Sequence, residues 1–368
     1  MTNTMWPYVY IIVFLTGALL SFFLTPLAEI IARHFNIISI PSERSVHKIP
    51  MPLLGGLGIY FSILITILTG ITAIRSGFFT SYLSEYIAGI QSVQGKLLAI
   101  LFGGGIVVAF GIVDDVKTLK AKQKLFLQIC ASIIIFAAGI RLSLTNTIPS
   151  FFLTIFWLIL MMNTFNLMDN MDGLSGGVAF ISGLILFVFA VRMGQLFVAT
   201  ILAVFLGSIA GFLKHNFPPA KIFMGECGSA FLGYFLGTAS ILLTFYKYQE
   251  HQTFLPIFAP LVVFSILFFD TLSVIWIRRK RGIPVFQADR NHLSHRLVDL
   301  GMTNKQAVLF IYLLTLCTGM GALLLGSLNI FGGLMVLFQV FIILSIVGIL
   351  ELTGRTKERN SDGKKGMD

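Results

Sequence analysis

Long uninterrupted apolar segments recur from one end of this chain to the other, and they limit its fold more than any other feature. About 20 consecutive apolar residues cross the hydrocarbon core of a bilayer, and a segment inside lipid has to satisfy its own backbone hydrogen bonds. Of the 368 residues, 56% are hydrophobic and only 11% are charged, against about 25% charged in ordinary soluble domains. The composition excludes a soluble enzyme and a disordered chain. It indicates a polytopic membrane protein.

The apolar runs predict an all-α protein with about eleven transmembrane helices. They are continuous rather than alternating, which argues against a β-barrel. No Lys or Arg precedes the first run, so we expect it to be a retained helix rather than a cleaved signal peptide. We expect residues 1–350 to form a single integral membrane domain and residues 351–368 a charged tail. The predicted spans are 7–32, 55–74, 97–113, 125–140, 151–165, 175–191, 196–213, 230–246, 255–277, 306–325 and 328–350.

The positive charges predict how the chain lies in the membrane. Most of the 26 Lys and Arg residues follow odd-numbered spans or lie in the C-terminal tail, and cytoplasmic loops carry the excess of Lys and Arg. The C-terminus is therefore expected in the cytoplasm of a multi-pass inner-membrane protein. The net charge of +10 needs no nucleic-acid partner, because anionic headgroups of the lipid bilayer attract the same residues. Only five Lys or Arg residues lie in the loops on the opposite, outer side: Arg75, Lys96, Arg141, Arg192 and Lys247.

Acidic side chains gather on the side that is expected to face the cytoplasm. A carboxylate beside the bilayer is costly unless it is paired or bound to a metal, and chance would scatter such groups over both faces. Convergence on one face therefore indicates a site. The acids are Asp114, Asp115, Asp169, Asp172, Glu226 and Asp289.

Two of the segments suit a hard cation. Asp114 and Asp115 end the third span, ahead of several lysines; adjacent carboxylates repel one another and attract a cation, although a plain polar helix end fits the pair equally well. The second segment repeats Asn or Asp every three residues. On a helix each such step drifts by about 60°, so its last three members share one broad face. The repeat is Asn163, Asn166, Asp169 and Asp172.

Two further segments suit a phosphate. Glu226 lies between Gly225 and Gly228 just before a helix, where it is either an ordinary first-turn acid or part of a loop that meets a metal-bound phosphate. The most basic loop carries Arg290 and Arg296, whose forked donors match phosphate oxygens. A basic loop at the membrane surface explains the arginines well and the neighbouring His292 and His295 poorly. One cation and one multiply charged phosphate would account for all four segments.

In this order, the motifs resemble those of the polyprenyl-phosphate N-acetylhexosamine-1-phosphate transferases, from Pro41 to about Gly301. Each motif is weak alone, and five in order on one side of the membrane are specific. They are the loop with Arg44, His47, Gly55 and Gly56, the pair Asp114-Asp115, the segment Asn166 to Leu174, the segment Phe223–Ser229 and the loop His292–Arg296.

The resemblance implies an Mg²⁺-dependent transfer on the cytoplasmic face, with Mn²⁺ as a substitute ion. A UDP-N-acetylhexosamine, most simply UDP-GlcNAc, would give its sugar 1-phosphate to a polyprenyl (undecaprenyl) phosphate and release UMP. A homodimer is compatible with this interpretation. By match to the family's motifs, Asn166 and Glu226 would bind the metal, and Asp114 or Asp115 would handle or hold the acceptor phosphate.

The resemblance also assigns the remaining polar residues. Lys124 would contact phosphate, and Asp169 and Asp172 would shape the nucleotide site. The other candidates for substrate binding are His47, Asn163, Arg290, Asn291, His292, His295 and Arg296.

At two positions this chain departs from the family pattern. Glu226 stands where the family usually has Asp, and Ser294 stands where it usually has His. Glutamate still binds Mg²⁺, but the octahedral geometry is strict, so the longer side chain requires its loop to lie slightly further back. Ser294 puts a proton or phosphate role at that position in doubt.

Other functions stay open as alternatives. A phospho-MurNAc-pentapeptide transferase is the nearest, and Asp-Arg-Asn before His292 favours the GlcNAc branch. A secondary transporter would place acids near the bilayer midplane of repeated halves; only Glu29 and Asp270 approach that depth, and no repeat is visible. A non-catalytic scaffold gives no reason for acids to converge on one face.

Overall fold

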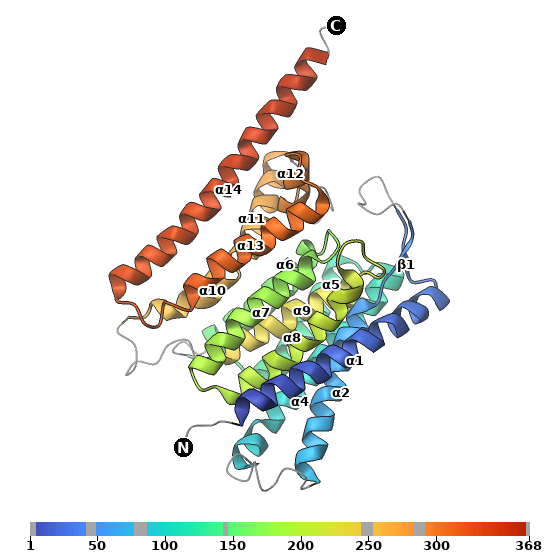
Figure 1. Ribbon diagram of the computed structural model, residues 1–368, viewed down its shortest axis with the longest axis vertical. Helices are drawn as coiled ribbons and strands as arrows, with labels where there is room; N and C mark the ends of the chain where they lie inside the picture. Colours follow the sequence, from blue (N-terminus) through green and yellow to red (C-terminus); the bar gives the residue numbers. More distant parts are fainter. Residues whose placement is uncertain are drawn as a thin grey trace. The chain divides into compact units, whose positions relative to one another are not determined.

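The computed structural model describes residues 5–41, 49–76, 87–142, 146–243, 253–282, 284 and 291–365. Its elements are almost all helices (Figure 1). In chain order they are α1 (Trp6–His34), β1 (Ile38–Ser39), β2 (Met51–Pro52), α2 (Gly55–Arg75), α4 (Ile87–Lys117), α5 (Ala121–Ala137), α6 (Thr147–Met168), α7 (Leu174–Arg192), α8 (Leu196–Asn216), α9 (Gly225–Leu242), η2 (Leu255–Phe258), α10 (Ala259–Val263), α11 (Ser265–Lys280), α12 (Leu293–Asp299), α13 (Asn304–Ala322) and α14 (Ile330–Lys365).

The all-α membrane architecture predicted from the sequence is confirmed. Among the described residues, eight helices are long and apolar enough to cross a membrane, or nine if the bent pair from Leu255 to Lys280 is one span. The other two predicted spans also fall on helices, α5 with 17 residues and α9, which begins beside Glu226. A total of eleven spans stays a prediction. The run predicted over 255–277 is not one straight helix, because it bends by 66° next to Phe264.

The chain divides into two compact units, 1–244 and 245–368, and a single domain over 1–350 stays a prediction. At the centre of the first unit lies α9, which is buried along nearly its whole length. Its small residues allow other helices to approach closely, as in membrane bundles generally. A Cβ on Gly233 would lie 2.3 Å from the carbonyl oxygen of Met161 on α6.

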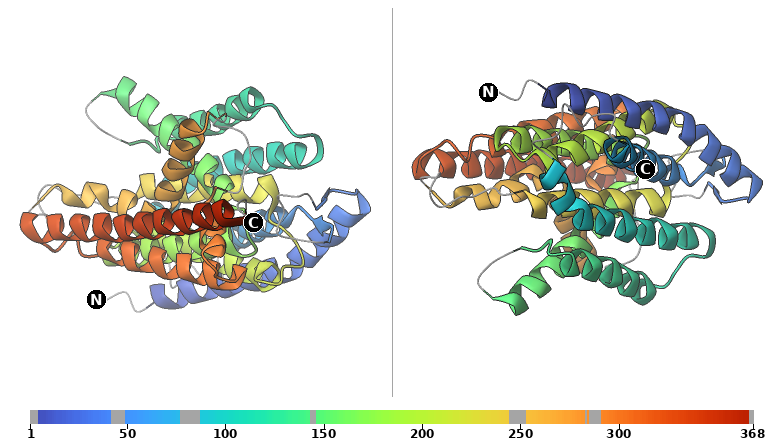
Figure 2. Two further views of the ribbon diagram at one scale, coloured as in Figure 1. Left: turned by 90° about the horizontal axis from the view of Figure 1, so that it is seen from above. Right: turned by 90° about the horizontal axis from the view of Figure 1, so that it is seen from below.

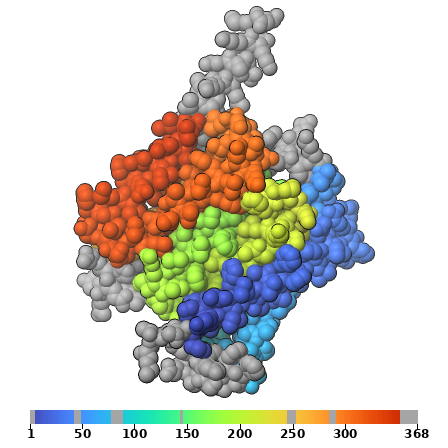
Figure 3. Space-filling model, viewed as in Figure 1, coloured from blue at the N-terminus to red at the C-terminus, as the bar shows by residue number. Residues whose placement is uncertain are grey.

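The N-terminal helix packs along α8 in the same way. A Cβ on Gly207 would meet the carbonyl oxygen of Phe14 at 2.0 Å, and one on Gly211 would meet that of Ala18 at 2.3 Å. Tyr10 of α1 meets Phe187 of α7 edge to face. In the space-filling view of Figure 3, α1 accordingly lies against the surface formed by α7 and α8. Its outer face, with side chains such as Phe23, remains exposed as a surface for lipid.

The segment before α9 is held by backbone hydrogen bonds from distant parts of the chain. The short strands β1 and β2 are antiparallel, and the carbonyl of Pro52 accepts a bond from the N–H of Phe223 at 2.8 Å. The N–H groups of Gly55 and Gly56 donate to the carbonyls of Phe223 and Met224. This network fixes where α9 begins.

The second unit contains η2 and α10 to α14. A capping box formed by Thr303 and Gln306 starts α13, which runs beside α14, the red helix in the two views of Figure 2. The seven-residue α12 packs against α13. It carries most of the described part of the basic loop that the sequence singled out.

Candidate active site

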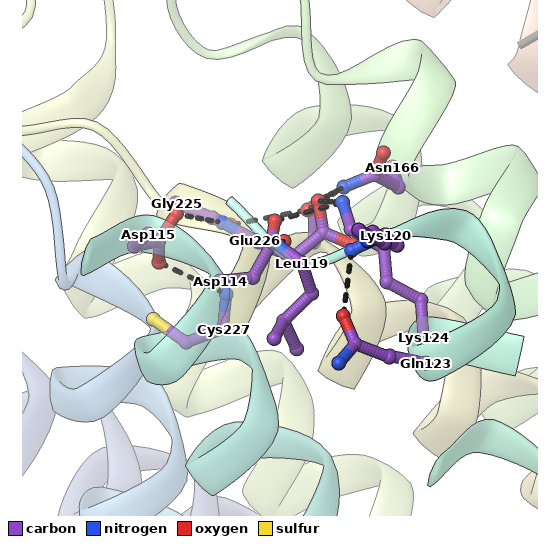
Figure 4. Close-up of polar contacts among 11 residues, drawn as sticks. Asp114, Asp115, Leu119, Lys120, Gln123, Lys124, Asn166, Gly225, Glu226 and Cys227 are labelled. Carbon is purple, nitrogen blue, oxygen red and sulfur yellow. Dashed lines mark hydrogen bonds and ion pairs between the residues drawn. The ribbon is translucent and has the colours of Figure 1, made fainter. Parts of the chain in front are cut away.

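The first turn of α9 is anchored by a carboxylate from the last turn of α4. Asp115 accepts a hydrogen bond from the N–H of Glu226 at 2.9 Å through Oδ1, and one from the N–H of Cys227 at 3.3 Å through Oδ2 (Figure 4). A carboxylate in this place satisfies N–H groups that have no partner within the helix and faces the positive end of its dipole. Asp115 therefore fixes the position of the adjoining Glu226.

Gly225 makes this contact sterically possible. Its φ is +75°, a left-handed conformation that favours glycine, and a Cβ there would lie 2.6 Å from Oδ2 of Asp115. Close packing thus explains why glycines stand on both sides of Glu226 in the sequence. Gly228 lies against α2, where a Cβ on Gly56 would approach its Cα to 2.3 Å.

Lys124 joins two acids from different helices. Its Nζ lies 2.7 Å from Oδ2 of Asp114 and 3.3 Å from Oε2 of Glu226. Asp114 is also held in place, because its Oδ1 accepts a hydrogen bond from the N–H of Leu119 at 2.6 Å. The lysine side chain is 26% exposed and that of Glu226 is 11% exposed, so this charge network is partly accessible from outside the protein.

Asn166 brings α6 into the same cluster. Its Nδ2 lies 2.5 Å from Oε2 of Glu226 and 3.1 Å from Oγ of Ser229. The sequence did not identify Ser229 as a site residue. Asn163, one step earlier in the repeat, lies apart from the cluster: its Nδ2 donates to Oε1 of Gln128 at 2.9 Å and so links α6 to α5.

Asp169 and Asp172 follow the end of α6 in the same region. Burial, followed by repulsion from Asp115, Glu226 and Asp172, raises the pKa of Asp169 to about 7. Oδ2 of Asp172 accepts a hydrogen bond from the N–H of Ala220 at 3.0 Å, which ties this loop to the segment before α9. Burial is the larger cause of this raised pKa, and the repulsion among the carboxylates is the part that a bound cation would relieve.

Glu226 and Asn166 offer oxygen atoms of the kind that Mg²⁺ takes as ligands. Among the described residues, no group of three or more His, Cys, Asp or Glu side chains is arranged to hold a metal ion. Mg²⁺ takes one or two carboxylates together with waters and substrate phosphates. Glu226 and Asn166 supply one carboxylate and one amide at the mouth of an anionic cluster. Half a turn of the Asn166 amide group would point Oδ1 instead of Nδ2 at the shared space.

An apolar groove of about 620 Å³ lies between α4 and α5. It adjoins the acidic cluster at Leu119, which lies in its wall and donates its backbone N–H to Oδ1 of Asp114. Much of the wall is exposed; Phe126, for example, is 64% exposed. Other residues along the groove are Ile106, Phe110, Lys122 and Leu127.

The second unit holds the histidine segment. His292, His295 and Arg296 are all buried, and Asn291 accepts a hydrogen bond from Nη1 of Arg281 at 3.1 Å. His47 and Arg290 lie outside the described residues. The sequence analysis connected Asp270 only with the transporter alternative, yet its Oδ2 lies 2.9 Å from Nδ1 of His292. Nothing in the spacing of the two residues, which lie on different helices, signals that contact.

Comparison with known proteins identifies relatives over nearly the whole chain. Residues 97–244 match the model of glycosyl transferase family 4, and this range includes every residue of the acidic cluster. The chain is 32% identical to the probable undecaprenyl-phosphate N-acetylglucosaminyl 1-phosphate transferase of Bacillus subtilis, over 95% of this chain and 93% of that protein. It is 31% identical to the decaprenyl-phosphate N-acetylglucosaminephosphotransferase of Mycolicibacterium smegmatis, over 81% and 78% of the two chains. The undecaprenyl-phosphate alpha-N-acetylglucosaminyl 1-phosphate transferase of Escherichia coli is 27% identical over 82% and 78%.

Proposed function

The chain belongs to glycosyl transferase family 4, and we propose that it transfers GlcNAc 1-phosphate from UDP-GlcNAc to a polyprenyl phosphate. Two relatives are named as N-acetylglucosamine phosphotransferases that use undecaprenyl or decaprenyl phosphate. Their names support GlcNAc as the sugar and a polyprenyl phosphate as the acceptor. The observation that carries the proposal is the convergence of Asp114, Lys124, Asn166 and Glu226 from four helices on one point. Phosphoryl transfer needs such positioning and charge compensation more than covalent chemistry.

The reaction exchanges one phosphoanhydride bond for another. An oxygen of the acceptor phosphate forms a bond to the β-phosphorus of the donor, and the bond from that phosphorus to the bridging oxygen breaks. UMP leaves with the electron pair. A phosphate monoester is mostly a dianion at neutral pH, since its second pKa is about 6, so the attacking oxygen needs no general base.

The roles of the side chains follow from their contacts. Glu226 and Asn166 would hold Mg²⁺ or Mn²⁺, which supplies positive charge to the diphosphate oxygens when it is bound. Lys124, kept in place by Asp114, presents its ammonium group to a phosphate oxygen. Asp115 gives both of its oxygens to the backbone of α9, so we assign it to positioning Glu226. Asp169 and Asp172 would line the nucleotide side of the site.

The apolar groove between α4 and α5 supports a lipid acceptor. A prenyl chain that lies along its wall would bring the attached phosphate toward Lys122 and Lys124, because the groove adjoins the acidic cluster. The excess of Lys and Arg on one side of the spans supports a position of this cluster at the cytoplasmic face of the inner membrane. A water-soluble nucleotide sugar would enter from that side.

A donor screen tests the proposal. The purified full-length protein is given undecaprenyl phosphate, Mg²⁺ and one of UDP-GlcNAc, UDP-GalNAc or UDP-MurNAc-pentapeptide, and UMP is measured. We expect acceptor-dependent UMP from UDP-GlcNAc, its loss with EDTA, and recovery with Mg²⁺ or Mn²⁺. UMP release from UDP-MurNAc-pentapeptide and from no other donor would instead identify the protein as a phospho-MurNAc-pentapeptide transferase. No UMP from any donor, with folded protein, would refute the proposed activity.

A further inference from the structure

The apolar groove between α4 and α5 carries a lysine other than Lys124. Among the residues that line it, Phe110 is only 4% exposed, whereas Val113 and Phe126 are 46% and 64% exposed. Lys122, in the first turn of α5, also lies in its wall and is exposed. The groove is therefore open to the surrounding lipid and has a positive charge close to one end.

Lys122 and Lys124 leave α5 on nearly opposite sides. Each residue of an α-helix turns by about 100°, so side chains two positions apart point about 160° away from each other. Lys124 turns to Asp114 and Glu226, whose carboxylates lie 2.7 and 3.3 Å from its Nζ. Within the described part of the chain, no carboxylate pairs with Lys122. The charge of Lys124 is thus already compensated, while that of Lys122 is available to an anion from the membrane.

The length of the groove suits the first part of a lipid chain. On α4 its wall runs from Ile106 to Val113, which is about 10 Å along the helix axis, whereas the hydrocarbon core is about 30 Å thick. A phospholipid would bring two acyl chains to a groove between one pair of helices, and a polyprenyl phosphate brings one. The groove also adjoins the acidic cluster, since Leu119 in its wall bonds to Asp114. Charge and position together favour a polyprenyl phosphate as the occupant.

We propose that Lys122 is an acceptor-binding residue, which binds the phosphate of the polyprenyl phosphate while the groove holds only the part of the chain next to it. This inference rests on the proposed function, which supplies the acceptor. It separates capture of the lipid at Lys122 from transfer at Lys124. Because Lys122 points away from the acidic cluster, its removal changes how tightly the acceptor binds and not how fast the bound acceptor reacts.

Steady-state kinetics at saturating UDP-GlcNAc test the role of Lys122. We expect Lys122→Gln to raise the KM for undecaprenyl phosphate about fivefold, as for an ion pair in a partly open place, and to change kcat by less than about twofold. Lys117→Gln removes the same charge from an exposed lysine at the end of α4, outside the groove, and should leave both constants unchanged. Equal effects of the two variants, or a fall in kcat at an unchanged KM, would overturn the assignment.

Photo-crosslinking to the full-length protein tests the groove without turnover. The photoreactive residue p-benzoylphenylalanine replaces Phe126 in the wall, or the adjacent Leu125, which is 45% exposed but lies outside the wall. We expect radiolabelled farnesyl phosphate, a short isoprenoid phosphate, to react at the first place and not at the second, and excess undecaprenyl phosphate to prevent the reaction. Equal labelling at both places, or equal protection by phosphatidylglycerol, would refute the proposal.

Filling the groove tests which part of the chain it holds. Ala109 is exposed in the wall, and Ala137 is exposed at the end of α5, outside it. We expect Ala109→Phe, but not Ala137→Phe, to weaken the crosslink and to raise the KM for farnesyl and undecaprenyl phosphate by similar factors. A higher KM for undecaprenyl phosphate alone would contradict the proposal. Wild-type crosslinking without UMP from any donor contradicts the proposed function alone, and UMP release without the crosslink contradicts this inference alone.

Discussion

Asp115→Asn is expected to lower turnover by about a hundredfold or more, while the protein is still made and inserted. Both oxygens of Asp115 accept backbone N–H groups at the start of α9. Asparagine keeps one acceptor, and its NH₂ group would face the other N–H, so the two donors repel. The first turn of α9 then shifts and displaces Glu226, and displacement of a reacting group by about 1 Å is enough to cost about a hundredfold.

The measurement is UMP release from UDP-GlcNAc, with expression and thermal midpoint checked in parallel. Asp299→Asn makes the same chemical change at an exposed carboxylate at the end of α12 and should leave the rate unchanged. Asp115→Asn with wild-type turnover would remove Asp115 from the site. A fall in the rate that is matched by loss of folded protein would reduce its role to stability.

Glu226→Ala is expected to lower turnover by about a thousandfold, and Glu226→Asp to retain much of it. Alanine removes the carboxylate that Asn166 and Lys124 share, and with it a proposed ligand for the divalent ion. The pair between Lys124 and Asp114 remains at 2.7 Å, so the local fold should survive. Losing one preorganised electrostatic group costs up to about a thousandfold, and the loss of the ion would add to this.

Glu226→Gln is the matched variant, because it keeps the length and removes the charge. We expect it to resemble Glu226→Ala in turnover at saturating Mg²⁺. Aspartate supplies the carboxylate that the family usually has at this position, one methylene shorter. A Glu226→Ala protein with an ordinary rate would show that the carboxylate takes no part in the reaction.

The helices could be predicted from the sequence because bilayer depth imposes a length on each apolar run. Within the described residues, ten of the predicted spans each fall on one helix; the run 255–277 covers η2, α10 and α11, and its bend at Phe264 was missed. Apolar content sets where a helix lies but not its local axis, and no residue pattern marked that bend. The number of membrane crossings likewise depends on how α5 and α9 are counted.

The acidic cluster was predicted in outline, because Asp114, Asn166 and Glu226 all fall at helix ends on one side. Contacts between helices decided the details. Asn163 shares the repeat with Asn166 but faces Gln128, since successive positions three residues apart turn around the helix axis. Asp270 is distant in sequence from its partner His292, and only the packing of α11 against α12 brings them together.

The most direct test of the central claim is whether Glu226 and Asn166 hold a divalent ion against the diphosphate. Mn²⁺ can be bound in place of Mg²⁺ together with UDP, unbound ion and nucleotide removed, and the coupling of the manganese electron spin to ³¹P measured by electron spin echo spectroscopy. The account predicts ³¹P coupling in the wild type and its loss in both Glu226→Ala and Asn166→Ala. Undiminished coupling in these variants, or bound Mn²⁺ without ³¹P coupling in the wild type, would contradict it.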